Sequence, residues 1–323
     1  MIVYIKGEGV VLNEPSVVAI DNSTNKILAV GDEAWRMVGR TPGNITAIRP
    51  LKSGVIADYG TTETMLKYFI KKTSSKKRFI RPRIMICIPT GATSVEKRAV
   101  LEAAHSAGAR KVYLIEEPVA SAIGAGLDIS RPYGHMVVDI GGGTTDAAVL
   151  SLGNIVYSRS IRVAGDKFDD ALIKYIRREH NIIIGERTAE ELKIKIGTAF
   201  PNDRDFTMEV RGRNLVSGLP NNIEVTSKET CVAMEEPINA IVDCVFNVLE
   251  NTPPELSADI SDKGIVMTGG GSLLHGLDKL ISVKSNIPVH VTDDPISSVA
   301  IGTGTALKHL DKLESSLITY RKP

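Results

Sequence analysis

The feature that most constrains the fold is an apolar run that leads directly into a glycine-rich loop. Residues 137–146 read Val-Val-Asp-Ile-Gly-Gly-Gly-Thr-Thr-Asp. The apolar start predicts a buried β-strand, and glycines allow backbone N–H groups to approach a phosphate closely. Asp139 ends the strand, where a carboxylate can hold a divalent cation, and Mg²⁺ would be held through water. The alternative is an ordinary glycine-rich hairpin. The predicted ligand-binding residues of this segment are Asp139, Gly141, Gly142, Gly143, Thr144 and Thr145.

A second glycine-rich turn occupies residues 267–272, which read Met-Thr-Gly-Gly-Gly-Ser. A strand is expected to end in the glycines, and a helix over residues 272–281 is expected to begin at Ser272 as its N-cap. Such a turn can hold a flat ring or a phosphate against the backbone, although a plain turn is an equal alternative. Together with the first loop it suggests a nucleotide site between two lobes. The residues expected to contribute are Gly269, Gly270, Gly271 and Ser272.

Two carboxylates, Glu116 and Glu117, stand between a predicted strand and a helix that opens with Pro118. A carboxylate in this place can orient a water for attack on a phosphate. The alternative is that it compensates the positive end of the helix dipole, which is the favoured interpretation for Glu116 and the less favoured one for Glu117.

A third group of candidate residues lies on two further predicted helices. The turn at Gly165 and Asp166 offers a second approach to a phosphate. The run Glu190-Glu191-Leu192-Lys193 places Glu190 and Lys193 three residues apart, on one helix face. They could hydrogen-bond a ribose, but the residues alone favour a solvated pair.

The segment Lys71–Arg83 carries seven basic residues and no acidic one, with Phe79 and Ile80 in its middle. A loop with a cationic rim and an apolar tip suits an anionic membrane surface. The alternatives are that Phe79 and Ile80 fold back onto a core, or that the segment binds nucleic acid, which the lack of interleaved aromatic residues disfavours.

Strand-like and helix-like segments alternate along the chain, which predicts an α/β fold with parallel crossovers. Residues 147–163 repeat the strand, tight turn, strand, strand pattern of residues 2–20, which indicates two halves built on one plan. The residue patterns also predict a helix over Ser94–Ala107 capped by Ser94, separate strands at Ile155–Tyr157 and Ser160–Val163, and a loop at Asn251–Ser261.

Composition excludes several classes of protein. Hydrophobic residues make up 43% of the 323 residues, and 39 basic residues balance 38 acidic ones. A disordered or coiled-coil chain and a global attraction to nucleic acid are therefore excluded. The three cysteines are far apart and form no metal-binding spacing, which indicates reduced thiols in a cytosolic protein. The sequence contains no run of 18 apolar residues that would predict a membrane span, and no secretion signal is recognisable in it.

Taken together, these segments resemble the MreB/Mbl family of bacterial actins, within the actin/Hsp70/hexokinase superfamily. The likeness runs over nearly the whole chain. It is carried by residues 13–18, 39–45, 49–52, 95–98, 116–119, 139–146 and 210–215.

The resemblance implies an actin-like, two-lobed α/β fold that binds ATP through residues 139–145, with Mg²⁺ on the phosphates. Glu117 would position the hydrolytic water, Glu190 and Lys193 would contact the nucleoside, and residues 269–272 would flank the base. It further implies self-assembly into filaments, with possible paralogues, at the inner face of the cytoplasmic membrane. Phe79 and Ile80 would insert there, and the filaments would organise the cell-wall elongation machinery and set rod shape. No nucleic acid partner is expected.

The resemblance also implies four subdomains. The first large one comprises residues 1–18, 61–131 and 302–323, and its small partner residues 19–60. The second large one comprises residues 132–167 and 232–301, and its small partner residues 168–231.

One departure bears on ATP hydrolysis. Family members open with a strand and a loop like Asp-Leu-Gly-Thr-Ala-Asn-Thr, whereas this chain opens at Met1-Ile2-Val3-Tyr4. The internal repeat gives the same expectation, that a strand and a first phosphate loop are lacking at the start. A truncated sequence, a wrongly assigned start, and a paralogue without ATPase activity are three explanations. Two other functions are a sugar or acid kinase of the same superfamily and a nucleotide-free scaffold that co-assembles with an intact paralogue.

Overall fold

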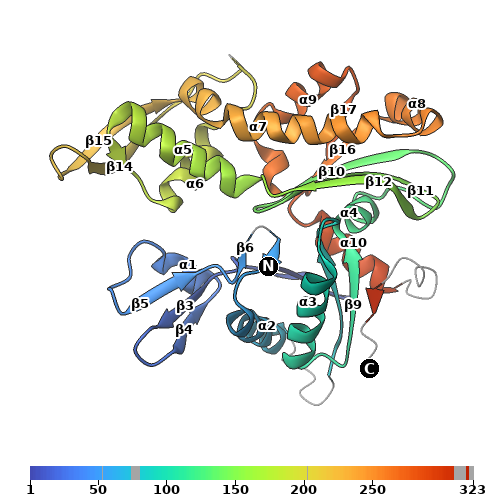
Figure 1. Ribbon diagram of the computed structural model, residues 1–323, viewed down its shortest axis with the longest axis horizontal. Helices are drawn as coiled ribbons and strands as arrows, with labels where there is room; N and C mark the ends of the chain where they lie inside the picture. The colour runs from blue at the N-terminus through green and yellow to red at the C-terminus, as the bar shows by residue number, and fades with distance from the viewer. Residues whose placement is uncertain (53, 74–80, 202, 309–317, 320–323) are drawn as a thin grey trace. The chain divides into compact units, whose positions relative to one another are not determined.

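The computed structural model describes residues 1–323 except for 53, 74–80, 202, 309–317 and 320–323. The chain divides into two compact units (Figure 1). Unit 1 comprises residues 1–131, 152–154 and 297–323, and unit 2 comprises residues 132–151 and 155–296. The finer division into four subdomains stays a prediction. No helix among the described residues is long and apolar enough to cross a membrane.

Unit 2 is built on a five-stranded sheet with the order β12-β11-β10-β16-β17. Its strands are β10 (His135–Ile140), β11 (Thr145–Ser151), β12 (Asn154–Ile161), β16 (Ile265–Thr268) and β17 (Val289–Val291). β10 pairs antiparallel with β11 and parallel with β16. Because β10 and β16 run in the same direction, their carboxyl ends, and the glycine-rich turns that follow them, lie at one edge of the sheet.

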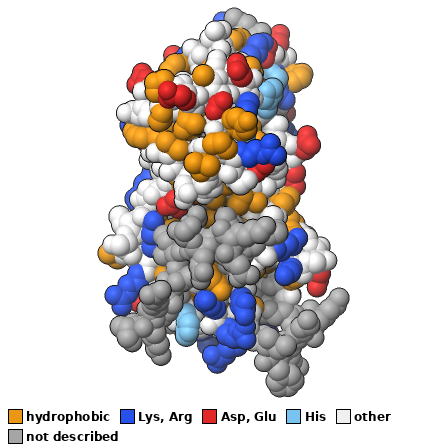
Figure 2. All heavy atoms as spheres, turned by 90° about the vertical axis from the view of Figure 1, so that its right-hand side faces the viewer, with side chains coloured by type: hydrophobic (Ala, Val, Ile, Leu, Met, Phe, Trp, Pro, Cys, Tyr) orange, Lys and Arg blue, Asp and Glu red, His pale blue; other side chains and the backbone are white. Residues whose placement is uncertain are grey.

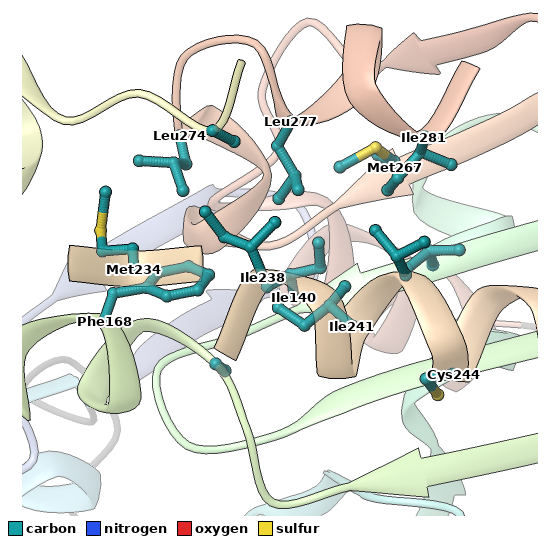
Figure 3. Packing of buried hydrophobic residues seen from close by; sticks show 14 of the residues in the cluster. Ile140, Phe168, Met234, Ile238, Ile241, Cys244, Met267, Leu274, Leu277 and Ile281 are labelled. Carbon is teal, nitrogen blue, oxygen red and sulfur yellow. The ribbon is translucent and has the colours of Figure 1, made fainter. Parts of the chain in front are cut away.

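The helices of unit 2 are α5 (Gly165–His180), α6 (Glu186–Ile196), α7 (Ser227–Glu250), α8 (Pro254–Lys263) and α9 (Leu277–Ser285). A second sheet has the order β13-β14-β15, from Ile182–Ile183, Thr207–Asn214 and Pro220–Thr226. One apolar core joins these elements (Figure 3). In it Ile140 and Met267 from the sheet pack with Phe168 on α5 and Ile238 on α7, all at most 3% exposed.

The described residues of unit 1 form four small sheets. Its strands are β1 (Ile2–Ile5) with β2 (Gly9–Asn13), β3 (Val18–Asp21) between β4 (Lys26–Val30) and β5 (Ile45–Ile48), β6 (Leu51–Lys52) with β7 (Val55–Ile56), and β9 (Lys111–Glu116) between β8 (Arg83–Ile88) and β18 (Ile318–Thr319). Its helices are α1 (Asp32–Met37), α2 (Tyr59–Thr73), α3 (Ser94–Ser106), α4 (Glu117–Gly124) and α10 (Ser298–Lys308). β8 and β9 are parallel around α3, as the crossover pattern predicts.

The two units differ in how the antiparallel hairpin is joined to the parallel strands. In unit 2, β10 joins the β11–β12 hairpin to the parallel strands. In unit 1, the hairpin β1–β2 and the parallel pair β8–β9 belong to separate sheets, although α10 contacts both β1 and β8. No strand among the described residues of unit 1 takes the place of β10.

An ion pair ties the end of α2 to the loop after β2. The Lys72 ammonium donates to the carboxylate of Glu14, which is 8% exposed. Gly31, at φ +73°, lies against the same carboxylate, because a Cβ there would be 1.9 Å from Glu14 Oε2. The last turn of α2 is thereby fixed to the β-rich part of unit 1.

Two expected helix boundaries are wrong for local chemical reasons. Helix α3 is capped by Thr93 rather than Ser94, because the Thr93 hydroxyl accepts from the Glu96 N–H while the Glu96 carboxylate accepts from the Thr93 N–H. The expected loop at residues 251–261 contains α8, because Pro254 stands at the first helical position, where a proline costs no hydrogen bond.

The expected division of residues 155–163 into two strands is also wrong. They form the single strand β12, which runs to Ile161. Because β12 is an edge strand of the sheet, its polar residues Ser158 and Arg159 can lie in a continuous strand.

Helices α4 and α10 of unit 1 pack against each other through glycines. A Cβ on Gly302 would be 1.8 Å from the carbonyl oxygen of Ala120, and a Cβ on Gly124 would be 1.9 Å from that of Ser298. These contacts leave no space for a methyl group, so the helices pack backbone to backbone.

We therefore expect Gly302→Ala to lower the free energy of unfolding by about 3 kcal/mol, because one helix must move to admit the methyl group. Gly60→Ala is the matched control: a methyl group on Gly60, which lies in α2, would meet no atom within 4 Å, and the change should be neutral or stabilising by up to about 1 kcal/mol. Urea unfolding of the parent chain and the two variants measures both changes in the free energy of unfolding. Equal stability of Gly302→Ala and the parent chain would contradict the close packing.

Candidate functional site

A buried carboxylate stands where β10 and β16 end. Asp139 is 4% exposed and lies opposite Thr268 in the parallel register. The Thr268 hydroxyl donates to Asp139 Oδ1 at 2.8 Å. The expected strand-end position of Asp139 is thus confirmed, and its side chain is held in one orientation by the neighbouring strand.

The first glycine-rich loop is pinned at both ends by backbone hydrogen bonds. The Gly141 N–H donates to the Thr144 carbonyl at 2.9 Å, and the Asp166 N–H donates to the Gly142 carbonyl at 2.7 Å. The Gly165 N–H donates to the Gly141 carbonyl at 3.2 Å. The loop that follows β10 is therefore hydrogen-bonded to the start of α5. The sequence alone did not predict this contact.

The two threonines of this loop are buried, and Gly142 between the strands is exposed. The Thr145 hydroxyl donates to the Val163 carbonyl at 2.7 Å, so it fixes the loop to the end of the segment that precedes α5. A contact of Thr144 or Gly143 with a phosphate stays a prediction.

The second glycine-rich turn packs directly on the end of β10. Gly269 has φ +81°, and a Cβ there would be 2.3 Å from the Ile140 carbonyl oxygen and 2.8 Å from Asp139 Oδ1. A Cβ on Gly271 would be 2.4 Å from Ile140 Cγ2. The structure thus brings the two glycine motifs together around Asp139, and only glycine permits this approach.

The prediction that Ser272 caps an α-helix is wrong. Residues Gly270–Leu273 form a short 3₁₀ turn, η1, and the Ser272 hydroxyl donates back to the Gly269 carbonyl at 2.6 Å. Helix α9 begins only at Leu277, after Gly276 in the left-handed region. Ser272 therefore stabilises the glycine turn itself.

Lys193 does not pair in solvent with Glu190, contrary to the interpretation that the residues alone favoured. Its ammonium lies 2.8 Å from Asp169 Oδ1 and donates to the Gly165 carbonyl at 3.1 Å. The nearby Glu191 forms an exposed pair with Lys195 at 2.6 Å. Lys193 thus reaches from α6 to the end of α5 that contacts the first glycine-rich loop.

Asp169 is the residue that sequence reasoning missed. It is 8% exposed, and burial raises the pKa of its carboxyl to about 6, although the Lys193 ammonium acts in the opposite direction. Its position one helical turn after Asp166, on the same face of α5 as Gly165, was the available signal.

The remaining candidates lie in unit 1 or outside the described residues. Glu117 is the first residue of α4, directly after β9, and is half-buried. Glu116 lies 3.4 Å from the Lys97 ammonium, so it has a cation as well as a helix end beside it. Phe79 and Ile80 lie outside the described residues.

The arrangement in unit 2 fits an anionic ligand with a hard cation. In the first loop Gly142 is exposed and Gly141 and Gly143 are half-buried, and the Asp139 carboxylate supplies the oxygen that Mg²⁺ prefers. The described residues contain no cluster of three His, Cys, Asp or Glu that could bind a metal ion by themselves. A cation here would take most of its ligands from water and from a phosphate.

Comparisons with known proteins show the family of the chain. The family model "MreB/Mbl protein" matches residues 1–315. The chain is 57% identical to "Cell shape-determining protein Mbl" of Bacillus subtilis (strain 168) over 97% of this chain and 94% of that protein.

Solved structures of actin-like proteins also resemble this chain. MreB5 of Spiroplasma citri bound to ADP is 40% identical, with a TM-score of 0.92 over 97% of this chain and 94% of that one, and the same protein was solved with AMPPNP. A MamK double helical filament shares the fold, with a TM-score of 0.79 at 21% identity over 94% of each chain. The expected actin-like α/β fold is confirmed.

We expect Gly269→Ala to destabilise unit 2 by about 2 kcal/mol or more, because its left-handed backbone and the contact with Ile140 both oppose a methyl group. Gly270→Ala is the matched control, since its Cβ would meet only Ile296 Cγ1 at 3.9 Å. Thermal unfolding of both variants measures the difference. If the two variants unfold together, the contact at Gly269 is not as tight as described.

Proposed function

Because the chain belongs to the MreB/Mbl family, we propose that it is an actin-like protein that binds ATP with Mg²⁺ and assembles into filaments at the inner face of the cytoplasmic membrane. There it would organise cell-wall synthesis and determine rod shape. Its Bacillus subtilis relative is named a cell shape-determining protein, which supports the second role. The observation that carries the proposal is the meeting of two glycine motifs around the buried Asp139.

The nucleotide part of the proposal rests on unit 2. Backbone N–H groups of Gly142 and Gly143 would bind phosphate oxygens, and residues 269–271 would lie against the nucleoside. Asp139 would hold a water of the Mg²⁺ shell, and the cation would neutralise charge on the phosphates. Solved structures of MreB5 with ADP and with AMPPNP support this assignment.

The filament part rests on relatives. The MamK structure is a filament of a protein with the same fold, and this chain is proposed to assemble with copies of itself and with paralogues. The family match favours this over a sugar or acid kinase. A nucleotide-free scaffold is the outcome that the binding experiment below would reveal.

The membrane part rests on charge. Residues 71–83 are strongly basic, and the described residues that flank this segment extend the basic surface. Arg83 opens β8 opposite Lys111 of β9, and the exposed Arg110 is joined to Pro82 by a backbone hydrogen bond. Figure 2 shows Lys and Arg side chains gathered at the lower edge of one face. Such a surface attracts anionic lipid headgroups.

Two measurements test the proposal. Calorimetric titration of the folded chain with ATP and Mg²⁺ should give saturable binding. Sedimentation with anionic vesicles should pellet the protein, and more of it with ATP. A folded chain that binds no nucleotide but pellets would be the scaffold, and one that binds nucleotide without pelleting would favour a kinase.

Replacing Phe79 and Ile80 by Ser should remove most vesicle co-sedimentation while the unfolding temperature stays the same, because apolar insertion adds to the electrostatic attraction. The matched control is Leu215→Ser with Val216→Ser, two residues on the β14–β15 turn that are 41% and 86% exposed. Unchanged pelleting of the Phe79 and Ile80 variant would remove the membrane role of this segment.

Glu117→Ala should lower phosphate release about tenfold or more without weakening nucleotide binding, because a general base or water-orienting group acts only in the chemical step. Glu116→Ala, which removes the neighbouring carboxylate paired with Lys97, is the control and should change release little. The readout is phosphate release at saturating ATP, beside calorimetry. If the parent chain releases no phosphate, Glu117 has no measurable catalytic role here.

A further inference from the structure

Asp169 and Lys193 form an ion pair that spans two helices of unit 2. Asp169 lies in α5 and Lys193 in α6, with side chains that are 11% and 16% exposed. The nitrogen–oxygen distance is 2.8 Å, and the same ammonium donates to the Gly165 carbonyl at 3.1 Å. The Lys193 ammonium is therefore held by two oxygens, one of which belongs to the turn that opens α5.

That turn is hydrogen-bonded to the first glycine-rich loop, which is the proposed phosphate-binding segment. The Gly165 N–H bonds to the Gly141 carbonyl, and a Cβ on Gly165 would lie 3.4 Å from that oxygen and 3.5 Å from the Lys193 nitrogen. The ammonium thus lies next to Gly165, which is itself hydrogen-bonded to the first glycine-rich loop. The Lys193 side chain would therefore already be ordered when an anionic ligand binds to the loop.

The pair is poorly explained as a device for stability. Burial raises the pKa of Asp169 to about 6 even with Lys193 beside it, and the carboxylates of Glu190 and Asp166 act in the same direction. A carboxyl whose pKa is higher in the folded than in the unfolded chain favours folding when protonated, and this contribution is lost as the pH rises through about 6. At neutral pH the ionised Asp169 therefore weakens the fold, which is typical of functional sites.

Exposed charge pairs close by provide the contrast. Asp170, the next residue of α5, pairs with Lys167 at 3.2 Å, and both side chains are 52% exposed. Glu191 and Lys195 on α6 are exposed to a similar extent. Pairs of this kind contribute little to stability or to a site. The ion pair of Asp169 and Lys193, by contrast, is largely buried and lies next to Gly165.

We propose that Asp169 is a positioning residue of the nucleotide site, whose carboxylate holds the Lys193 ammonium beside the Gly165 carbonyl so that the cation is ordered before the ligand binds. This rests on the proposed nucleotide binding. Ordering a long side chain in advance lowers the entropy that binding must otherwise oppose. Removing the carboxylate should leave Lys193 charged but free to leave the loop.

The first test needs no ligand. Acetylation of the nucleotide-free chain by acetic anhydride, followed by mass spectrometry, reports how accessible each lysine nitrogen is. Asp169→Asn should increase the rate at Lys193 at least threefold and leave Lys195 unchanged. Asp170→Asn, the matched control, should leave Lys193 unchanged. An unchanged rate at Lys193 in Asp169→Asn would overturn the proposal, whatever the chain binds.

The second test measures affinity. At pH 7.5, Asp169→Asn and Lys193→Met should each raise the calorimetric Kd for ATP with Mg²⁺ about fivefold or more, and the double variant should be no weaker than Lys193→Met alone. Asp170→Asn should stay within twofold of the parent. If Asp169→Asn lowers the unfolding temperature but leaves the Kd unchanged, the pair merely joins two helices and the proposal is wrong.

The pH dependence separates positioning from general damage. The charged groups that act on Asp169 are Lys193 and Glu190 from α6 and Asp166 from α5. Protonation of Asp169 below pH 6 should make the parent chain behave like Asp169→Asn, so the ratio of their Kd values should fall from about five at pH 7.5 towards one at pH 5. This ratio cancels the titration of the nucleotide. A ratio that does not change with pH would contradict the proposal.

The outcomes distinguish this proposal from the proposed function. The parent chain could bind no ATP while the acetylation rate at Lys193 still rises in Asp169→Asn. In that case the proposed nucleotide binding is wrong, and the role of Asp169 towards that ligand is wrong with it, although Asp169 does hold Lys193. If the parent binds ATP and neither reactivity nor affinity responds, the positioning role alone is wrong.

Discussion

The candidate site depends on the contact between a glycine turn and the end of one strand. Gly269 lies so close to the Ile140 carbonyl and the Asp139 carboxylate that a methyl group would overlap both. This contact places the segment after β16 against the segment after β10, and the Thr268 hydroxyl holds Asp139 from the same side. The backbone bonds from Gly165 and Asp166 to the first loop then attach α5 to this point. The proposed site for an anionic ligand would thus be made mainly from backbone, with few side chains.

Much of this could be predicted from the sequence. Runs of apolar residues that end in glycines predict strands followed by turns, and parallel strands bring such turns to one edge of a sheet. This is why Asp139 and the two glycine motifs could be identified in advance. The resemblance to a known family then assigned the glycines to phosphate and nucleoside.

The errors came where a local pattern has two physical solutions. A serine after glycines can cap a helix or bond back into the turn, and Ser272 does the latter because α9 starts only after Gly276. Two prolines can mark a loop or start a helix, as Pro254 does. The partner of Lys193 was missed because Asp169 lies 24 residues earlier, and only the packing of α5 on α6 brings the two side chains together.

The fixed end of α2 has a mechanical consequence. Lys72 is bound to Glu14, and Glu14 is confined beneath Gly31, so the last turn of α2 cannot move without disturbing the loop after β2 and the turn before α1. A pull applied to the chain just beyond residue 73 would pass through this ion pair into the β-rich part of unit 1.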